Sequence, residues 1–475
     1  MSWQTFLLHA FTYGILVYSM ILLTFYLLIG SFSILETRSY LHKNSFTDYR
    51  MLASSSEAPT MTILAPAYNE GPTIIENVRS LLSLHYNNLD VIIINDGSKD
   101  DTLEQLIKAY DLYKADFYVT QLIKTKTVKG IYRSHNPVYR KLTVIDKENG
   151  GKADALNVGI NIARSDYFVC IDVDCVLEQD AILKLAKPFM ETSTHRVIAA
   201  GGVVRVANSC EIEGGRLVKV HLPKKFLPRI QTLEYIRAFL LSRMAWTRLN
   251  GLLLISGAFG AFDREIVIAC GGYHTDTVGE DMELVVRMRR YMEEREEPYK
   301  VGFIPDPLCW TEAPSSYRIL GRQRNRWTRG TIETLRSHKK MFFNPNYGIL
   351  GMLSYPYWFF FEFLAPIIEF LGTLGIIIYF FTYAINWSAV VIMIIVICIG
   401  ILYSIFAILM EVLTYNQYKQ RKDILKLVLV AILEPFIFHP FVVWSAVLGN
   451  ISLLRKQNSW GEMTRQGFAT DKKSR

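Results

Sequence analysis

The chain has 475 residues, of which 51% are hydrophobic and only 20% are charged, and its mean hydropathy is +0.18. Soluble domains are about one quarter charged, and the apolar residues of this chain gather toward its two ends. These features exclude a disordered tail protein, a small disulfide scaffold and a purely soluble enzyme. They favour a water-soluble centre mounted on membrane helices.

The net charge of +8 and the cysteine spacing both fit a cytosolic, membrane-associated setting. Basic residues collect in cytosolic loops of membrane proteins and next to anionic lipid. No helix-turn-helix, zinc-finger or RNA-recognition signature accompanies the charge, so nucleic acid is not an expected partner. The six cysteines include no pair at Cys-x-x-Cys spacing, which predicts neither a zinc site nor a disulfide framework.

The first segment predicts a membrane helix. Residues 7–35 carry no formal charge and exceed the roughly 20 residues that span a bilayer. No Lys or Arg precedes them, unlike in a secretory signal peptide. The first basic residue that follows is Arg38, so the positive-inside rule places the next segment in the cytosol. We therefore expect an N-terminal transmembrane helix within residues 1–36.

Residues 55–345 are expected to form a cytosolic α/β domain, because apolar runs of strand length alternate with helical patterns. Such alternation predicts a Rossmann-like, mostly parallel sheet. The expected strands are Met61–Leu64, Val91–Ile94, Tyr167–Asp172 and Val197–Val204. The expected helices are Pro72–Ser83, Asp101–Tyr113 and Lys152–Ala163. Two basic, aromatic stretches look like insertions into this pattern: Tyr113–Lys141 and Glu211–Lys225.

The remainder is again apolar and is divided into an interfacial segment (346–362), transmembrane or re-entrant helices (363–454) and a basic tail (455–475). The basic loop Lys419–Lys426 should be cytosolic. A last segment that fully spans the bilayer would then place the basic tail outside, so either the charge rule fails there or one segment re-enters or lies in the interface.

Polar residues inside the last apolar segment allow two interpretations. Glu434 and His439 lie there beside Pro435 and Pro440, and ionisable residues at membrane depth are costly and usually functional. They could line the path of a polar polymer, or they could serve helix packing or an interfacial bend.

Two acidic residues follow the first two strands. Glu70 closes the run that begins at Ala65, and Asp96 follows Asn95. Ligands of open α/β sheets bind outside the carboxyl ends of the strands, so both side chains should face one crevice. Asp96 could hydrogen-bond a nucleobase or a ribose hydroxyl; alternatively, it belongs to a turn and helix cap.

A glycine-lysine loop and an acidic pair follow. The glycines before Lys152 would let backbone amides approach phosphate, and Lys152 would add a charge. Asp172 and Asp174 end a buried strand, and residues two apart in a strand point the same way. The two carboxylates would repel each other unless a cation lies between them. We therefore expect Mg²⁺ or Mn²⁺ there, bridging a diphosphate, rather than an ordinary acidic turn.

Three later motifs complete the candidate site. The small-residue loop that contains Phe259 could admit an acceptor sugar or could simply pack. Glu280 and Asp281 open a helix, where Asp281 could be a general base or a cap. Gln323 shares a helix face with residues three and four positions later, Arg326 and Trp327. Arg suits a diphosphate, and Trp offers a stacking surface for a sugar ring.

The ordered set of motifs from Asp96 to Trp327, set between apolar segments, resembles the membrane-embedded processive family-2 glycosyltransferases. These include poly-N-acetylglucosamine, hyaluronan, chitin and cellulose synthases. The run Cys309–Pro314 ahead of Gln323 looks most like the poly-N-acetylglucosamine branch. The resemblance covers roughly residues 60–330. The two basic insertions and the single preceding span depart from several relatives and leave the sugar open.

The resemblance implies a GT-A fold and an inverting transfer from a UDP-sugar to a growing polysaccharide. Asp96 would contact the uridine, and Lys152 with Arg326 would contact the phosphates. Asp174, with Asp172, would hold the metal, and Asp281 would take the proton of the acceptor hydroxyl. The expected location is the plasma (inner) membrane, with lipid and room for an accessory secretion subunit as partners. The alternative is a single transfer to a lipid or lipid-phosphate acceptor; a transporter and an inactive nucleotide-sugar sensor fit less well.

Overall fold

The protein is described here by a computed structural model that covers residues 3–55, 58–116, 119–191, 194–382 and 387–454. One ten-stranded sheet organises the soluble part, in the order β3-β4-β5-β2-β1-β6-β11-β8-β12-β7. The strands are β1 (Met61–Ala67), β2 (Leu89–Asn95), β3 (Leu112–Ala115), β4 (Val128–Ser134), β5 (Leu142–Lys147), β6 (Tyr167–Ile171), β7 (Val176–Leu177), β8 (Arg196–Val206), β11 (Phe259–Asp263) and β12 (Tyr299–Thr311). A separate hairpin pairs β9 (Glu211–Glu213) with β10 (Arg216–Lys219).

The centre of the sheet is parallel, as the sequence predicts. Strands β5, β2, β1 and β6 run in one direction, and β11 pairs antiparallel with both β6 and β8. The apolar run in β2 is buried on both faces except at Asp90, which is typical of a central parallel strand. All four expected strands are present, so the α/β fold class is confirmed.

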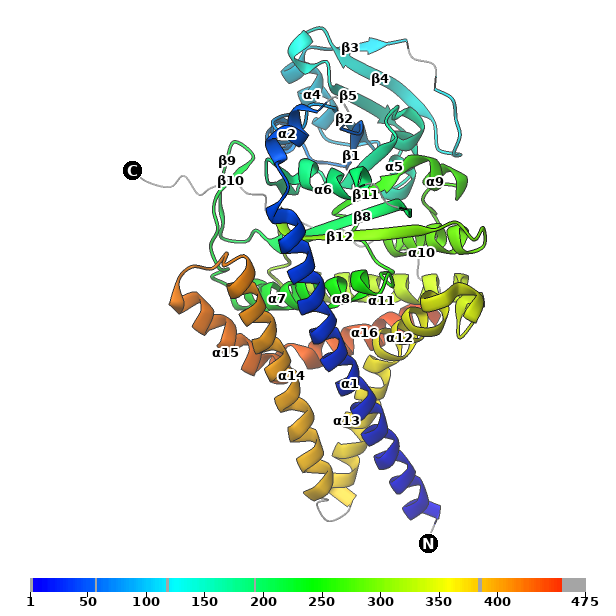
Figure 1. The fold of residues 1–475 in the computed structure, drawn as a ribbon, viewed down its shortest axis with the longest axis vertical. Helices are drawn as coiled ribbons and strands as arrows, with labels where there is room; N and C mark the ends of the chain where they lie inside the picture. The colour runs from blue at the N-terminus through cyan, green and yellow to red at the C-terminus, as the bar shows by residue number, and fades with distance from the viewer. Residues whose placement is uncertain (1–2, 56–57, 117–118, 192–193, 383–386, 455–475) are drawn as a thin grey trace.

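The helices that connect these strands cover the sheet (Figure 1). They are α3 (Ile74–Leu82), α4 (Thr102–Tyr110), α5 (Lys152–Ile162), α6 (Ala181–Met190), α9 (Arg264–Ala269) and α10 (Glu280–Glu293). Helix α11 (Tyr317–Ser337) follows the last strand, β12, and packs against α10 and α16 (His439–Leu454). The expected helix Asp101–Tyr113 was too long at its C-terminal end. Asp111 is left-handed, with φ of 49°, and closes α4, so the chain turns there into β3 instead.

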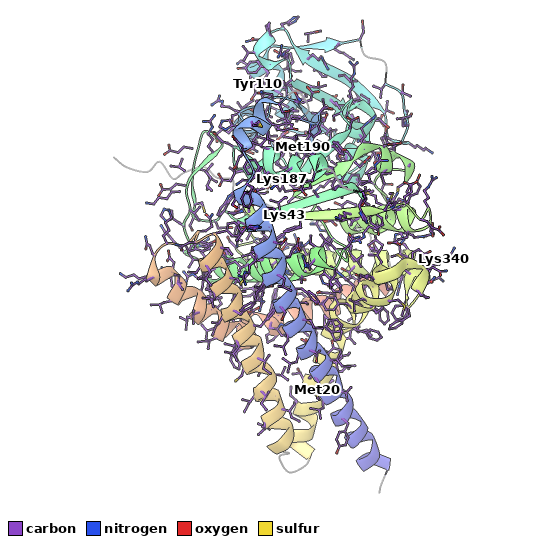
Figure 2. The ribbon with its side chains drawn as sticks, viewed as in Figure 1. Met20, Lys43, Tyr110, Lys187, Met190 and Lys340 are labelled. Atoms are coloured by element: carbon purple, nitrogen blue, oxygen red, sulfur yellow. The ribbon has the colours of Figure 1, made fainter. Side chains whose placement is uncertain are left out.

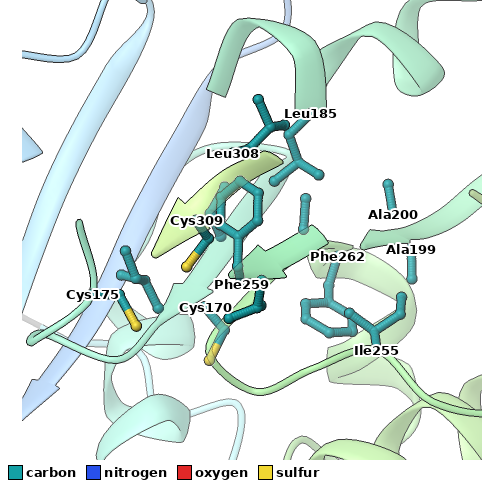
Figure 3. Packing of buried hydrophobic residues seen from close by; sticks show 14 of the residues in the cluster. Cys170, Cys175, Leu185, Ala199, Ala200, Ile255, Phe259, Phe262, Leu308 and Cys309 are labelled. Atoms are coloured by element: carbon teal, nitrogen blue, oxygen red, sulfur yellow. The ribbon is translucent and has the colours of Figure 1, made fainter. Parts of the chain in front are cut away.

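Apolar side chains pack closely beneath the strand ends and form part of the hydrophobic core. Figure 3 shows Cys170, Phe259 and Cys309 packed together there, and all three are fully buried. A Cβ at Gly202 would lie 2.5 Å from the Phe259 ring. The glycine therefore makes room for the aromatic side chain.

Within the described part of the chain, three helices are long and apolar enough to cross a membrane: the segments Tyr13–Ser45, Leu350–Gly375 and Val390–Thr414. They belong to α1 (Trp3–Ser45), to a run that ends in α13 (Ala365–Thr382), and to α14 (Trp387–Thr414). Figure 1 shows these helices extending together away from the sheet. In Figure 2, Met20 lies on the extending part of α1, whereas Lys43 and Lys340 lie nearer the sheet.

The run before α13 consists of short helical pieces rather than an isolated interfacial helix. These are η4 (Pro345–Tyr347), η5 (Leu350–Ser354), α12 (Tyr355–Tyr357) and η6 (Trp358–Phe363). Part of the expected interfacial segment 346–362 therefore lies inside a candidate span, and the interfacial assignment stays a prediction.

The last two helices are α15 (Arg421–Ile437) and α16 (His439–Leu454). They are bent by 48° at the break between them, which lies next to the predicted prolines Pro435 and Pro440. Figure 1 shows them crossing beneath the domain instead of running alongside α1, and α16 packs against α11. This arrangement favours the re-entrant or interfacial alternative. The predicted basic tail lies outside the described residues.

The domain is joined to the membrane helices through a third layer of helices, α7 (Phe226–Ile236), η2 (Arg237–Arg243) and α8 (Met244–Arg248). Arg237 forms an ion pair with Glu434 of α15 and donates to Ser404 of α14. Arg205 on β8 forms a fully buried ion pair with Glu411 of α14. Because breaking one partner of a buried pair is costly, these contacts fix the domain on its membrane helices.

Candidate active site

One cavity of about 1950 Å³ connects the strand ends with the membrane helices. Near the sheet it is lined by residues that follow β1, β2 and β6: Tyr68, Asn69, Glu70, Asp96 and Asp172. Its middle is lined by Glu280, Asp281, Gln323, Arg326 and Trp327. Its far part is lined by Tyr26, Tyr403, Glu434 and His439. The structure therefore brings most of the predicted site residues to one continuous space.

Asp96 is almost fully buried and organises the glycine loop. Its Oδ1 accepts from the backbone N–H of Gly150 at 2.9 Å, and its Oδ2 accepts from that of Gly151 at 2.8 Å. Lys147 donates to Asp96 at 2.5 Å and pairs with Asp154 at 2.7 Å. Both oxygens of Asp96 thus already have partners, and its contact with uridine stays a prediction.

Lys152 lies at the first turn of α5, where the sequence places it, but it pairs with an acid of the predicted metal site. Its Nζ lies 2.5 Å from Oδ1 of Asp172 and donates to the Gly257 carbonyl at 3.0 Å. Burial opposes the charged form of the amine, yet the field of Asp172 outweighs it and raises the Lys152 pKa above its ordinary value. Lys152 is therefore a fixed cation between the glycine loop and the acidic pair.

The acidic pair has the donors that a divalent ion requires. Ligand atoms of Asp172, Asp174 and Cys175 all lie within 4.8 Å of one another. Asp172 lines the cavity, and Asp174 lies deeper, with 8% of its surface exposed. Two carboxylates of this kind suit Mg²⁺ or Mn²⁺, which prefer oxygen ligands. The residues therefore fit the predicted metal.

Glu280 and Asp281 begin α10 and face the same cavity. Burial, and next the charge of Asp281, raise the pKa of Glu280 to about 7, against the opposing fields of Lys152 and Arg326. Oδ2 of Asp281 accepts from the Gly257 N–H at 3.1 Å. Glu280 thus keeps its proton to a higher pH than an ordinary carboxyl does, while the Asp281 carboxylate is oriented by a backbone amide.

The starts of α10 and the middle of α11 approach closely at two glycines. A Cβ on Gly279 would lie 2.6 Å from the Cα of Gly330, so neither position has room for a side chain. Further along α10, Glu283 receives hydrogen bonds from His338 and Arg287. Burial alone would raise the pKa of Glu283, but these bonds outweigh it and lower the pKa to about 2. The close approach brings the start of α10, with Asp281, beside the helix that carries Gln323, Arg326 and Trp327, and all four residues line the same cavity.

That face of α11 presents an amide, a guanidinium and an indole to the cavity. Trp327 is 41% exposed, and the guanidinium of Arg324 lies 4.3 Å from its ring centroid. Arg324 is itself held by Glu234 of α7 at 2.6 Å. Oε1 of Gln323 is buried and has no hydrogen-bond partner among the described residues. An acceptor for a ligand hydroxyl is thus available beside an exposed aromatic surface.

Two further predicted residues differ in their surroundings. Glu70 lines the cavity at the start of α3, where Thr73 donates to its Oε2 at 3.4 Å. Phe259 is fully buried and does not line the cavity. The expected acceptor contact of Phe259 is therefore wrong, because the first residue of β11 points into the core; the neighbouring Gly257 and Ala258 line the cavity instead.

Sequence reasoning missed Lys147, Arg237 and Arg243. Lys147 is fully buried, whereas lysines are rarely buried, so nothing in its pattern revealed the role. Arg243 lines the cavity between the domain and the membrane helices. Burial lowers its pKa to about 10, although Asp281 and Glu362 partly oppose this. Both arginines lie in a helical segment that carries no recognisable motif.

Fold, site and membrane helices together define a membrane-associated glycosyltransferase. Residues 62–209 match the family described as Glycosyl transferase family 2, and residues 167–410 match Glycosyl transferase family group 2. The second match spans more than half of the chain. The chain therefore belongs to the family-2 glycosyltransferases and is an enzyme of that class.

Curated relatives and a solved structure agree with this assignment. The chain is 28% identical over 324 residues to a poly-beta-1,6-N-acetyl-D-glucosamine synthase of Staphylococcus aureus, a match that covers 68% of this chain and 66% of that protein. It is 29% identical over 275 residues to a synthase of the same name from Staphylococcus epidermidis, covering 58% of this chain and 55% of that protein. The matches thus span less than two thirds of these relatives.

A mannosyltransferase from Pyrobaculum calidifontis, solved in complex with GDP-mannose and Mn²⁺, has a similar fold. The TM-score is 0.50 at 15% identity, and the likeness covers 86% of this chain and 99% of that one. The GT-A fold class expected from the sequence is thereby confirmed.

Proposed function

We propose that the protein transfers a hexose or N-acetylhexosamine from a UDP-sugar to a growing polysaccharide, with inversion at the anomeric carbon. We further propose that transfer is processive and that the product crosses the membrane through the same protein. The single observation that carries the proposal is the continuous cavity. It joins Asp96 and Lys152 with Asp281 and Trp327, and it continues to Tyr403 and Glu434 of the membrane helices.

The proposed chemistry takes place between the start of α5, which carries Lys152, and the start of α10, which carries Asp281. The donor lies along the glycine loop, with its uridine toward Asp96 and its diphosphate toward Lys152. Asp281 takes the proton of the acceptor hydroxyl, whose oxygen forms a bond with the anomeric carbon. The bond from that carbon to the phosphate oxygen breaks, and its electron pair leaves with UDP. Arg326 and Lys152 stabilise the charge that develops on UDP.

A divalent ion, Mg²⁺ or Mn²⁺, is the proposed cofactor. Asp174 and Asp172 would hold it, and it would neutralise charge on the diphosphate. The Mn²⁺ complex of the similar mannosyltransferase supports the choice. Asp174 is proposed to take the greater share in metal binding, because Lys152 already shares the Asp172 carboxylate.

The acceptor is proposed to lie along α11. The Trp327 ring offers an exposed apolar surface, and Gln323 offers an acceptor to a sugar hydroxyl. Beyond them the cavity wall combines apolar side chains with a few polar ones, namely Tyr26, His439 and the ion pair of Glu434 with Arg237. A polar polymer needs such groups at membrane depth, and this supports translocation.

The proposed location is the plasma (inner) membrane, with several spans and a cytosolic catalytic domain. Three candidate spans and the bent pair α15–α16 support the membrane assignment. The basic loop Lys419–Lys426 lies on the domain side of α14, as Figure 1 shows, and supports the cytosolic orientation. An accessory secretion subunit and membrane lipid are proposed as further partners.

The experiment is a donor screen on the purified full-length protein. UDP-GlcNAc, UDP-glucose, UDP-glucuronate and UDP-galactose are each supplied with Mg²⁺ or Mn²⁺. UDP release is measured, and products are sized and digested with linkage-specific glycosidases. A long product from one donor is expected. Addition of a single sugar would instead identify the lipid-acceptor alternative, and absence of UDP release from every donor would contradict the proposal.

A further inference from the structure

The basic insertion that follows α4 reaches the nucleotide end of the cavity. It forms β3 and β4, which extend the sheet beyond β5 at the edge remote from the membrane helices (Figure 1). Between these strands the chain returns toward α5, and Lys126 lines the main cavity together with Asp96, Asn149 and Gly150. A segment that looked unrelated to the site therefore forms part of its wall.

The part of the insertion that contains Ile123 and Lys126 is hydrogen-bonded to α5 at several points. The side chain of Asn161 accepts from the backbone N–H of Ile123 at 2.9 Å and donates to its carbonyl at 2.8 Å, and both residues are buried. The backbone N–H of Lys126 donates to Oδ1 of Asp154 at 3.1 Å. Because α5 begins at the glycine loop, these bonds fix the position of Lys126 relative to that loop.

The ammonium of Lys126 has unused binding capacity. Its Nζ donates to the carbonyl of Asn149 at 2.7 Å, the residue immediately before the two glycines. An ammonium has three N–H donors, and this partner carries no charge. Lys147 and Lys152, by contrast, are both paired with carboxylates. No carboxylate among the described residues forms an ion pair with Lys126. Its side chain is exposed toward the cavity.

We propose that the insertion serves to place Lys126 on the diphosphate of the nucleotide-sugar donor. The inference rests on the proposed function and adds a binding residue to that site. The diphosphate is the charged part of the donor, and a charged hydrogen bond to phosphate is stronger than one to a neutral carbonyl. When the donor enters, the Lys126 ammonium donates a hydrogen bond to a phosphate oxygen. This bond either replaces its bond to the Asn149 carbonyl or forms in addition to it.

The test compares nucleotide binding by calorimetry in full-length variants in the same detergent. Lys126→Ala should lower the affinity for UDP and for GDP about tenfold, which corresponds to the loss of one charged hydrogen bond. The affinity for uridine, which has no phosphate, should stay unchanged. Lys126→Arg should restore most of the UDP affinity. Lys124→Ala is the matched control, because Lys124 is an exposed lysine of the same segment that does not line the cavity, and it should bind UDP as the wild type does.

Equal UDP affinity in Lys126→Ala and Lys124→Ala would overturn the proposal, as would a loss of uridine affinity as large as that of UDP. The GDP arm separates this inference from the donor identity. If the wild type prefers GDP and Lys126→Ala still loses about tenfold, the lysine keeps its role while UDP is excluded as the donor nucleotide. If the wild type binds neither nucleotide, both the proposed nucleotide-sugar donor and the proposed role of Lys126 are contradicted.

Discussion

Replacing Glu280 by Gln should change how the stability of the protein depends on pH. The folded protein raises the pKa of Glu280 from 4.5 to about 7, mainly through burial. At about 1.36 kcal/mol for each pH unit, this difference corresponds to about 3 kcal/mol. The folded state keeps a proton that the unfolded state releases, so the contribution of Glu280 is fully present below pH 4.5 and is lost as pH rises to about 7.

The assay is reversible unfolding, followed by tryptophan fluorescence in detergent from pH 5 to pH 8. As pH rises across this range, the free energy of unfolding of the wild type should fall by up to about 3 kcal/mol relative to that of Glu280→Gln. The stability advantage of the variant should therefore be largest at pH 8. Glu297→Gln, at an exposed position after α10, controls for loss of a carboxylate. Parallel pH curves for wild type and Glu280→Gln would refute the reasoning.

Two further changes test the metal site and the buried cluster below the glycine loop. Asp174→Asn should abolish metal-dependent UDP release while leaving the thermal midpoint close to that of wild type; activity that survives in chelator would remove the metal role. Lys147→Met should destabilise the protein by about 3–5 kcal/mol, because it leaves Asp96 and Asp154 buried without their cation. The exposed Lys129→Met in β4 should change the unfolding free energy little, and an equal effect of both variants would contradict the cluster's role.

The sequence predicted the features that depend on local pattern. The strands β1, β2, β6 and β8 have apolar runs bounded by turn residues, so their positions could be predicted within a few residues. The helix that carries Gln323 and Trp327 follows from their spacing, and the structure places both on the cavity wall.

Features that depend on tertiary contacts could not be predicted in this way. Burial of Lys147 results from carboxylates on two other segments, and Phe259 was misassigned because strand β11 turns its first side chain toward Gly202. The insertion gave no sign that Lys126 would reach Asn149, since Asn161 holds that segment in place through its backbone.

The most direct test of sugar transfer compares wild type with Asp281→Asn under matched conditions. The carboxamide keeps the oxygen that accepts from Gly257 but cannot take a proton, and general bases contribute about 10²–10⁴-fold. Initial rates of UDP release are measured with Mn²⁺ and the donor preferred by the wild type, with UDP binding as a check that the site is intact. We predict at least a hundredfold lower rate at unchanged UDP affinity. A variant that releases UDP at the wild-type rate would contradict the assignment of Asp281 as the base.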